Sequence, residues 1–322
     1  MIKLIIQIPC FNEEKTLPIT LHDLPRELPG IDRIEWLIVD DGSVDKTVEV
    51  AIANGVDHII RHVHNLGLAR AFMTGLEASI DLGADIIVNT DGDNQYVAAD
   101  IPKLIAPILT GKAQMVIGER PISSIRHFSV GKKILQGSGS WLVRKLSNVD
   151  VPDAPSGFRA FSREAAMQLH VFNEYTYTLE TIIQAGHKRI AVTTVPVRTN
   201  EKLRPSRLIS SIPSYVIKSS LTILRIFMTY QPFNFFVAPG VISFGLGFLV
   251  SLRFVYYYFT SRGQGHVQSL ILAGILMSLG GFLVVTGLIA DLISVNRKLL
   301  ETIEWRIHSL AEKVNSKEGK TH

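Results

Sequence analysis

Short apolar runs alternate with polar turns over the first two hundred residues of the chain. The runs are strand-sized and rich in β-branched residues, and the stretches between them are long enough for helices. They occupy residues 4–8, 35–39, 58–62, 86–89 and 115–118, and a later run follows at 189–197. Strands that alternate with helices predict an α/β domain whose mostly parallel sheet is covered by helices on both faces.

Polar clusters follow these runs, at the point where each predicted strand ends. Because the carboxyl ends of parallel strands lie at one edge of a sheet, we expect the clusters to meet in one crevice there. The clusters are Pro9–Glu14, Asp40–Thr47, Asn65–Ala71, Asp91–Gln95 and Glu119–Pro121. Their convergence is the first indication of a binding site.

The most informative cluster is Asp91–Gln95, which follows an apolar run typical of a buried strand. It contains two carboxylates one residue apart, Asp91 and Asp93, and then the amide of Gln95. Hard oxygen ligands suit Mg2+ or Mn2+, which keep some waters and complete their shell with substrate phosphates. A turn rich in Asp and Asn that binds no ion would use the same residue types. The cluster alone does not separate these two interpretations.

Composition and motifs exclude several other classes. The chain has no Gly-rich loop ending in Gly-Lys-Ser/Thr, and Gly137–Ser140 does not lie between a strand and a helix, which excludes P-loop and Rossmann dinucleotide sites. A formal net charge of +4 over 322 residues gives no indication of a nucleic-acid partner. The one cysteine, Cys10, excludes an intramolecular disulfide and a cysteine metal cluster.

The C-terminal third is markedly apolar, and a hydrophobic fraction of 47% for the whole chain directs attention to it. Two stretches, 235–260 and 267–290, exceed the roughly 20 residues that cross ~30 Å of hydrocarbon. The link at 261–266 is too short for a domain, so the two predicted spans form a hairpin with both outer flanks on one side. Basic residues concentrate on those flanks, and the positive-inside rule places them in the cytoplasm.

We therefore expect a cytoplasmic catalytic domain at 1–207, an amphipathic juxtamembrane helix at 208–230, two transmembrane helices within 234–295, and a cytoplasmic helix and tail at 296–322. The juxtamembrane helix either lies in the headgroup plane or packs on the core as an ordinary surface helix. The first nine residues lack the features of a signal peptide. These features predict a multi-pass membrane protein.

Five clusters in this order resemble the motifs of family 2 glycosyltransferases, which have the GT-A fold. More narrowly, they resemble the polyprenyl-phosphate sugar transferases, the group that includes dolichyl-phosphate mannose synthase and bacterial undecaprenyl-phosphate glucosyltransferases. The motifs are Pro9–Glu14, Val39–Ser43, Asn65–Gly67, Asp91–Gln95 and Asp153–Arg159. The resemblance covers residues 2–197 and implies a Rossmann-like GT-A domain. The interfacial helices and two-span tail that follow are similar to those of bacterial members, which anchor this domain by a C-terminal hairpin, and this likeness implies a bacterial-type inner (plasma) membrane.

The resemblance also implies roles for the donor site. The residues that would hold the base and ribose of a nucleotide sugar are Pro9, Phe11, Asn12, Glu13, Asp41 and Asp91. Asp91, Asp93 and Gln95 would hold the divalent ion on the donor diphosphate, with Asp93 as the direct ligand. Gly92 stands where relatives usually carry Ala, a change that leaves the acid oxygens in place.

The implied acceptor is a lipid phosphate, which is already anionic and needs cations more than a strong base. Arg120 matches the arginine that follows the fifth strand in relatives, and Arg159, Lys132, Lys133 and Ser138 are further phosphate partners. Asp153 would orient the acceptor or take its proton; a turn or cap residue is the alternative. For the lysines the alternative is a solvated basic face.

The expected reaction is therefore inverting transfer of a hexose from a UDP- or GDP-linked sugar to undecaprenyl phosphate. Two other functions stay open: transfer to diacylglycerol or a lipid-linked glycan, and a non-catalytic membrane scaffold. The expected partners are a nucleotide sugar, a polyprenyl phosphate and membrane lipid, and the resemblance implies a homo-oligomer, a tetramer among relatives. The loop Arg204–Arg207 departs from the Gly-x-Ser-Lys loop that closes over the donor in many relatives.

Overall fold

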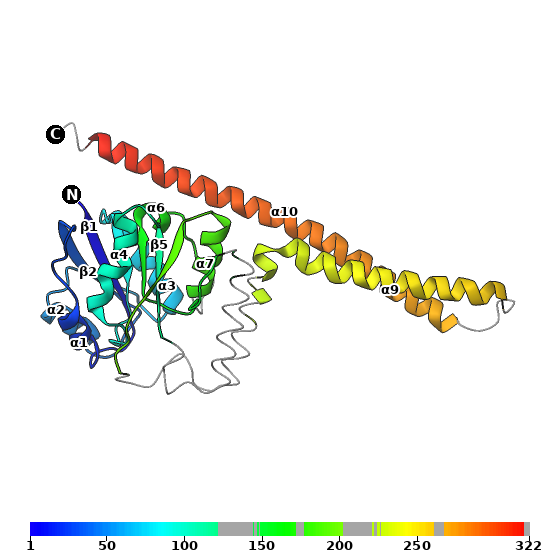
Figure 1. Cartoon of the computed structure of the whole chain (residues 1–322), viewed down its shortest axis with the longest axis horizontal. Coiled ribbons are helices and arrows are strands. Elements are labelled where there is room, and N and C mark those ends of the chain that lie inside the picture. The colour runs from blue at the N-terminus through cyan, green and yellow to red at the C-terminus, as the bar shows by residue number, and fades with distance from the viewer. Residues whose placement is uncertain are drawn as a thin grey trace. The chain divides into compact units, whose positions relative to one another are not determined.

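The computed structural model describes residues 1–121, 149–171, 177–201, 227–260 and 267–318, together with residues 144, 147, 221, 224 and 225. The chain divides into two compact units, Met1–Lys218 and Ser219–His322. The first unit holds a sheet and short helices. The second holds two long helices, α9 (Pro232–Thr260) and α10 (Val267–Glu318) (Figure 1).

The described residues of the first unit form a seven-stranded sheet with the order β3-β2-β1-β4-β6-β5-β7. The strands are β1 (Lys3–Cys10), β2 (Arg33–Asp40), β3 (His58–Arg61), β4 (Ile86–Asn89), β5 (Met115–Glu119), β6 (Arg159–Ser162) and β7 (Val192–Pro196). Neighbours are parallel except at β6, which is antiparallel to β4 and β5. The prediction of a mostly parallel α/β sheet is confirmed.

The reversed direction of β6 has a consequence for the site. Strand β5 ends at Glu119, and β6 begins at Arg159 opposite Asn89 and Ile117, near the carboxyl ends of β4 and β5. The residues just before β6 therefore lie at the edge where the parallel strands end. This places the Asp153–Arg159 motif beside the polar clusters that follow β1, β2 and β4.

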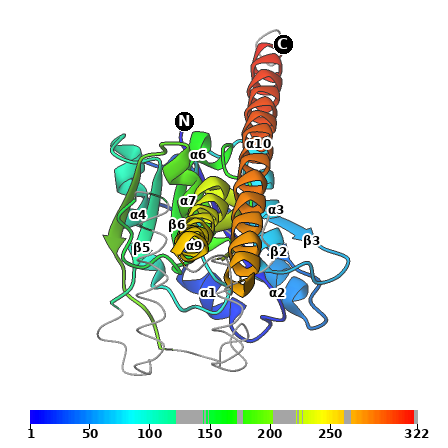
Figure 2. The ribbon, with the colours of Figure 1, turned by 90° about the vertical axis from the view of Figure 1, so that its right-hand side faces the viewer.

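Helices pack on both faces of this sheet (Figures 1 and 2). On one face, Ile6 and Ile8 of β1 share a core with residues of α1 (Leu17–Asp23) and α4 (Ile101–Leu109). On the other face, Gly75 of α3 (Leu68–Asp81) lies so close to Gln7 that a Cβ would stand 2.7 Å from its Oε1. The remaining helices of this unit are α2 (Thr47–Ala53), α6 (Arg163–Ala166), α7 (Thr178–His187) and the 3-10 turn Ala98–Asp100.

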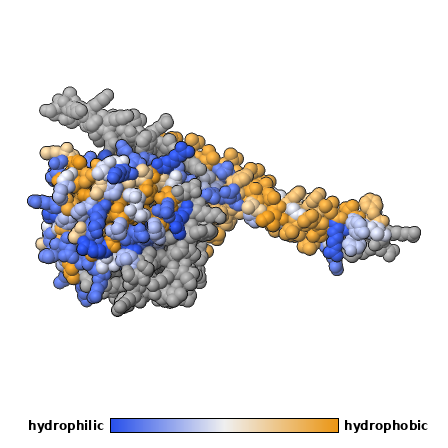
Figure 3. Space-filling view, viewed as in Figure 1, coloured by the Kyte–Doolittle hydropathy of each residue, from blue (hydrophilic) through white to orange (hydrophobic). Residues whose placement is uncertain are grey.

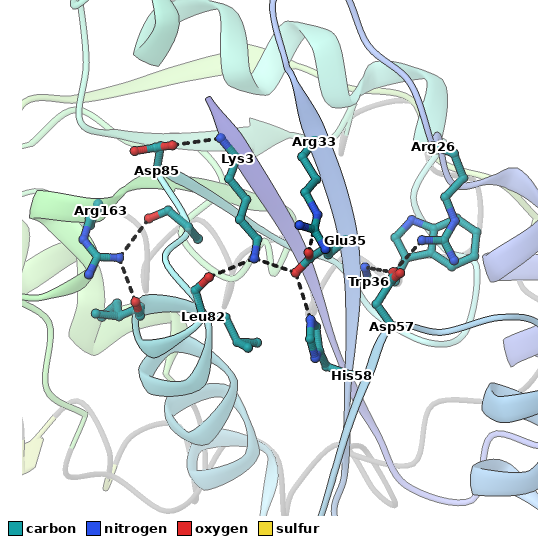
Figure 4. Close-up of polar contacts among 12 residues, drawn as sticks. Lys3, Arg26, Arg33, Glu35, Trp36, Asp57, His58, Leu82, Asp85 and Arg163 are labelled. Carbon is teal, nitrogen blue, oxygen red and sulfur yellow. Dashed lines mark hydrogen bonds and ion pairs between the residues drawn. The ribbon is translucent and has the colours of Figure 1, made fainter. Parts of the chain in front are cut away.

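A charged network ties the amino ends of the strands together, at the edge opposite the polar clusters (Figure 4). The buried carboxylate of Glu35 accepts from Lys3 Nζ at 2.7 Å, Arg33 Nε at 2.6 Å and His58 Nε2 at 2.8 Å. Burial alone would raise the pKa of Glu35, but the hydrogen bonds from Lys3 and His58 outweigh it and lower that pKa. Glu35 thus joins the starts of β1, β2 and β3.

The second unit is an antiparallel hairpin of α9 and α10. Small residues let the two backbones meet: a Cβ on Gly280 would lie 2.6 Å from the Phe244 nitrogen and 2.7 Å from the Gly240 oxygen. Helix α9 and the segment Val267–Arg297 of α10 are long and apolar enough to cross a membrane. Figure 3 shows the apolar surface that this hairpin presents.

Helix α10 differs from the prediction in one respect. We expected a separate cytoplasmic helix within residues 296–322, but a single helix runs without interruption from Val267 to Glu318. The physical reason is that residues 288–318 contain neither Gly nor Pro, so nothing ends the helix after the apolar span. The predicted juxtamembrane helix lies largely outside the described residues.

Candidate active site

The predicted polar clusters meet at the carboxyl edge of the sheet. Cys10 at the end of β1 pairs with Asp40 at the end of β2, and Gln7 pairs with Asn89 at the end of β4. The ladder extends past the strand ends, since the Asp41 nitrogen donates to the Cys10 oxygen at 2.8 Å. Side chains that follow these strands therefore start from adjacent backbone positions.

The Pro9–Glu14 motif is joined to the turn after β2. The Asn12 nitrogen donates to Ser43 Oγ at 2.8 Å, and Asn12 Oδ1 accepts from the Val44 nitrogen at 2.9 Å. Asn12 adopts φ +55°, which Asn tolerates better than most residues. The Glu13 nitrogen donates to Thr47 Oγ1 at 2.8 Å, and the buried Glu13 carboxylate accepts from Thr16 Oγ1 at 2.6 Å.

Two further residues of this motif have contrasting positions. Pro9 is buried within β1, whereas the Phe11 ring is 36% exposed at the edge of the sheet. An exposed aromatic ring beside buried polar groups offers a surface on which a planar base can stack. Phe11 thus offers such a surface, and its contact with the nucleotide base stays a prediction.

Asp41 holds the loop that carries the Asn65–Gly67 motif. Its Oδ1 accepts from the Leu66 nitrogen and from His62 Nδ1, both at 2.8 Å, and its Oδ2 accepts from the Gly67 nitrogen at 2.9 Å. His62 in turn contacts Thr74 Oγ1 through Nε2 at 3.1 Å. Both carboxylate oxygens of Asp41 thus accept hydrogen bonds from residues 62–67, and these bonds hold that loop in position.

Gly42 completes the contact between the two loops. Its φ is +73°, and a Cβ there would lie 2.6 Å from the His64 carbonyl carbon and 2.8 Å from the Asn65 nitrogen. Only glycine permits this approach without displacement of the backbone. The first three motifs are therefore one packed assembly in which side chains hold neighbouring backbone segments.

The turn Asp91–Gln95, called the acid turn below, follows β4. The half-buried Asp93 accepts from the Gln95 nitrogen at 3.2 Å, which is the local bond of an Asx turn. The Gln95 oxygen accepts from the Asn200 nitrogen at 2.9 Å, which attaches the turn to the segment after β7. Asp91 is also half-buried. Among the described residues, no group of three or more His, Cys, Asp or Glu side chains is arranged to hold a metal ion.

Gly157 joins the acid turn to the Asp153–Arg159 loop. A Cβ on Gly157 would lie 3.3 and 3.4 Å from the two Asp91 carboxylate oxygens and 2.8 Å from the Tyr177 hydroxyl. The Gly157 nitrogen donates to the Tyr96 hydroxyl at 3.0 Å, and its oxygen accepts from Asn89 Nδ2 at 2.8 Å. Residue 157 can therefore pack this closely against Asp91 and Tyr177 only because it has no side chain.

Three residues of this network, Asn89, Tyr96 and Tyr177, were not among the predicted site residues. All three are buried, and Asn89 Nδ2 also donates to the Tyr177 hydroxyl at 2.9 Å. Burial raises the pKa of both tyrosines, so both hydroxyls keep their protons at neutral pH. The one sequence signal was Asn89, a polar residue that ends an apolar strand.

Arg120 and Asp153 form a bidentate ion pair. Arg120 Nε lies 2.7 Å from Asp153 Oδ2 and Nη2 lies 2.9 Å from Oδ1, and the Arg120 nitrogen also donates to Oδ2 at 3.2 Å. Asp153 is fully buried. Burial alone would lower the pKa of Arg120, but Tyr96 and the hydrogen-bonded Asp153 outweigh it and raise that pKa. Arg120 stays charged.

Arg159 lies beneath the same loop with no exposed surface. Its guanidinium donates to the Ser156 oxygen at 2.7 Å, the Ala154 oxygen at 2.7 Å and Thr181 Oγ1 at 2.5 Å. Burial lowers the pKa of Arg159 to about 10, so the group is still charged at neutral pH. In this conformation the side chain contacts the loop and offers no surface to a phosphate.

The predicted residues thus fall into two linked groups. Asn12, Glu13 and Asp41 connect the first three motifs, and Asp91 adjoins the loop that contains Asp153. Predicted partners in the segments 122–143 and 202–220 lie outside the described residues, namely Lys132, Lys133, Ser138 and Arg204–Arg207.

A mostly parallel sheet with an acid turn after its fourth strand has the architecture of the GT-A fold. The model of the Glycosyl transferase family 2 matches residues 5–169, and the chain belongs to this family. The protein is therefore a glycosyltransferase.

Named relatives agree with this assignment, and a solved structure shares the fold. A UDP-N-acetylglucosamine–dolichyl-phosphate N-acetylglucosaminyltransferase of Methanococcus voltae is 32% identical over 60% of this chain and 83% of its own. An undecaprenyl-phosphate mannosyltransferase of Micrococcus luteus is 29% identical over 48% of this chain and 64% of its own. Glucosyl-3-phosphoglycerate synthase of Mycobacterium tuberculosis, solved with Mn2+ and UDP, shares the fold with a TM-score of 0.52 and 22% identity, over 69% of this chain and 79% of its own.

Proposed function

We propose that the protein transfers a hexose from a UDP- or GDP-linked sugar to a polyprenyl phosphate, with undecaprenyl phosphate as the expected acceptor. Transfer inverts the anomeric carbon and takes place on the cytoplasmic leaflet. Family membership supports the sugar transfer, and the names of two relatives support a polyprenyl-phosphate acceptor. The apolar hairpin supports attachment to the membrane that contains such lipids.

The proposed site for the nucleotide-sugar donor consists of the motifs Pro9–Glu14, Val39–Ser43 and Asn65–Gly67 together with the acid turn. Phe11 would contact the base, and Asn12, Glu13 and Asp41 would shape the pocket for base and ribose by holding the adjoining loops. Pro9 would shape the same pocket from within β1. The Gly157 backbone, which packs closely against Asp91, would hold that carboxylate beside the loop that contains Asp153.

The residues of the acid turn fit a divalent ion. Asp91 and Asp93 offer carboxylate oxygens and Gln95 an amide oxygen, and both acids are only half-buried. Mg2+ and Mn2+ require few protein ligands when substrate phosphates and waters complete the shell, so the lack of a larger acid cluster among the described residues is consistent with the ion. When bound, the ion would neutralise the charge that develops on the departing nucleoside diphosphate.

The observation that carries the choice of acceptor is the Arg120–Asp153 pair. A hydroxyl acceptor needs a general base, but both oxygens of Asp153 accept hydrogen bonds from Arg120. A phosphate acceptor needs a cation instead, and Arg120 remains charged at the same edge of the sheet as the acid turn. We propose that Arg120 attracts the lipid phosphate and that Asp153 orients Arg120.

We assign Arg159 a different part from the one first expected. Because its guanidinium is enclosed by the Ala154 and Ser156 carbonyls, we propose that it holds the loop that presents Asp153 and Gly157. It would then affect catalysis through the position of those residues.

Competition between acceptors tests this proposal against transfer to diacylglycerol. The purified protein, one active nucleotide sugar and an equimolar mixture of undecaprenyl phosphate, dolichyl phosphate and diacylglycerol are incubated in detergent. We expect sugar on the lipid phosphates only, in a β linkage. Labelled glycosyl diacylglycerol as the main product would overturn the choice of acceptor but leave the sugar transfer intact.

A further inference from the structure

A single residue that follows β7 contacts three successive carbonyls at the end of the acid turn. The Asn200 side-chain amide donates from Nδ2 to the Asn94 oxygen at 3.0 Å and, at the longer distance of 3.5 Å, to the Tyr96 oxygen. The Asn200 backbone nitrogen donates to the Gln95 oxygen between them at 2.9 Å. Asn200 lies 106 positions after Asn94 in the chain, so these bonds form only when the domain is folded.

A short antiparallel pairing brings Asn200 to this position. Tyr96 and Thr199 form an antiparallel bridge. The preceding residue, Arg198, is tied to the buried Asp100 carboxylate, because its backbone nitrogen donates to Oδ2 at 2.7 Å and its Nη2 donates to Oδ1 at 2.8 Å. Backbone pairing and an adjacent ion pair therefore place Asn200 at the acid turn, so a change of its half-buried side chain should leave the segment where it is.

The acid turn depends on such contacts because it lies outside regular secondary structure, between β4 and the 3-10 turn Ala98–Asp100. Asn94 adopts φ +55°, a left-handed conformation that is uncommon for a residue other than glycine. The two expected ion ligands Asp93 and Gln95 flank this residue on either side. The bonds from Asn200 therefore hold the backbone from which both ligand side chains extend.

Helix α1 holds the other side of the same turn. Thr20 Oγ1 donates to the Gly92 oxygen at 3.2 Å. Asn94 Nδ2 donates to Asp23 Oδ2 at 3.1 Å. The turn is thus fixed between α1, which follows the Pro9–Glu14 motif, and the segment after β7.

We propose that Asn200 is a positioning residue that sets the affinity of the acid turn for a divalent ion. Groups that hydrogen-bond to the ligands of a metal or hold them in place commonly change its affinity 10–100-fold. Without the Asn200 amide, the ion would have to order the turn as it binds, and that ordering weakens binding. The inference rests on the ion site of the proposed function. The alternative is that Asn200 only stabilises the folded domain.

Titration of the purified full chain with Mn2+ alone, with free Mn2+ followed by electron paramagnetic resonance, tests this. Binding that persists in Asp93→Ala is subtracted as nonspecific. Asn200→Ala should raise the Kd for Mn2+ at least about tenfold and keep the number of sites. Asn200→Gln, which retains the amide on a longer side chain, should recover part of the affinity.

The matched control is Asn54→Ala. Asn54 Nδ2 also donates to a backbone carbonyl, that of Val50 at 2.8 Å, but at the exposed end of α2. This variant should leave the Kd for Mn2+ unchanged.

Two results would contradict the role of Asn200 in different ways. The same Kd in the wild type and Asn200→Ala, with or without a lower melting temperature, would show that Asn200 serves stability alone and would leave the ion site intact. If the wild type bound no more Mn2+ than Asp93→Ala, the ion site of the proposed function would fall, and the role of Asn200 with it.

Discussion

Both carboxylate oxygens of Asp153 accept hydrogen bonds from the Arg120 guanidinium, at 2.7 and 2.9 Å. The two residues are 33 positions apart and come from the end of β5 and the loop before β6. Since Asp153 is fully buried, loss of Arg120 would leave a carboxylate without its cation. This pair connects the stability of the site to the proposed capture of an anionic acceptor.

The first prediction separates those two contributions. Arg120→Met should lower the free energy of unfolding by about 3 kcal/mol, because one partner of a buried ion pair remains alone. It should also lower hexose transfer by at least about 100-fold. The double variant Arg120→Met/Asp153→Asn should recover most of the stability but none of the activity. Thermal unfolding and a transfer assay measure both; recovery of activity in the double variant would contradict the proposed role of Arg120.

A second prediction concerns Gly157. Gly157→Ala should lower transfer strongly, because the new Cβ would lie 2.8 Å from the Tyr177 hydroxyl and about as close as packing allows to Asp91. Tyr177→Phe removes the hydroxyl and provides the matched control. The double variant should regain stability, since the closest clash is gone, but not full activity, since the contact with Asp91 remains. Wild-type activity in Gly157→Ala would show that the close packing of residue 157 against Asp91 is not required for transfer.

A third prediction concerns Gly92, which packs against Cys10. A Cβ there would lie 3.0 Å from Cys10 Sγ, which is tighter than ordinary contact. Gly92→Ala should therefore lower the free energy of unfolding by about 1–2 kcal/mol through overpacking. Cys10→Ala should remove the effect in the double variant, a result that a double-mutant cycle of melting temperatures would detect. Equal costs of Gly92→Ala with and without Cys10 would contradict this explanation.

A fourth prediction tests the network at the amino ends of the strands. Because the pKa of Glu35 is lowered in the folded protein, its ion pairs stabilise the fold above the unfolded-state pKa of about 4.3. That stabilisation is lost as the pH falls through the folded-state pKa. Glu35→Gln should cost about 2 kcal/mol at pH 7 and progressively less below pH 4. The exposed Glu27 gives the control Glu27→Gln; a pH-independent difference for Glu35→Gln would contradict the account.

Much of the fold follows from patterns that the sequence displays. Apolar runs such as Ile86–Asn89 place strands, and because these strands are parallel, the residues after them share one edge. The family resemblance also identifies the acid turn by residue types alone. These features are local or periodic, so they do not depend on contacts between distant residues.

Other features depend on tertiary contacts and could not be predicted in this way. Strand β6 is only four residues long, Arg159–Ser162, and its sequence does not show that it lies between β4 and β5 in the reverse direction. The enclosure of Arg159 by the Ala154 and Ser156 carbonyls follows from that insertion. The extent of α10 was a different error: the second span was divided from a cytoplasmic helix at 296–322, although residues 288–318 contain neither Gly nor Pro to end the helix.

The central claim is that a divalent ion at Asp91, Asp93 and Gln95 supports hexose transfer to a lipid phosphate. The most direct measurement is mass spectrometry of the lipid formed by the purified full chain from undecaprenyl phosphate and a panel of UDP- and GDP-sugars. Each reaction is run with Mn2+, with Mg2+ and with a chelator, and for the wild type and Asp93→Ala. We predict a hexosyl lipid phosphate with at least one donor, only when metal is present, and none from Asp93→Ala. Product that persists with the chelator or in Asp93→Ala, or no product from any donor, would contradict the claim.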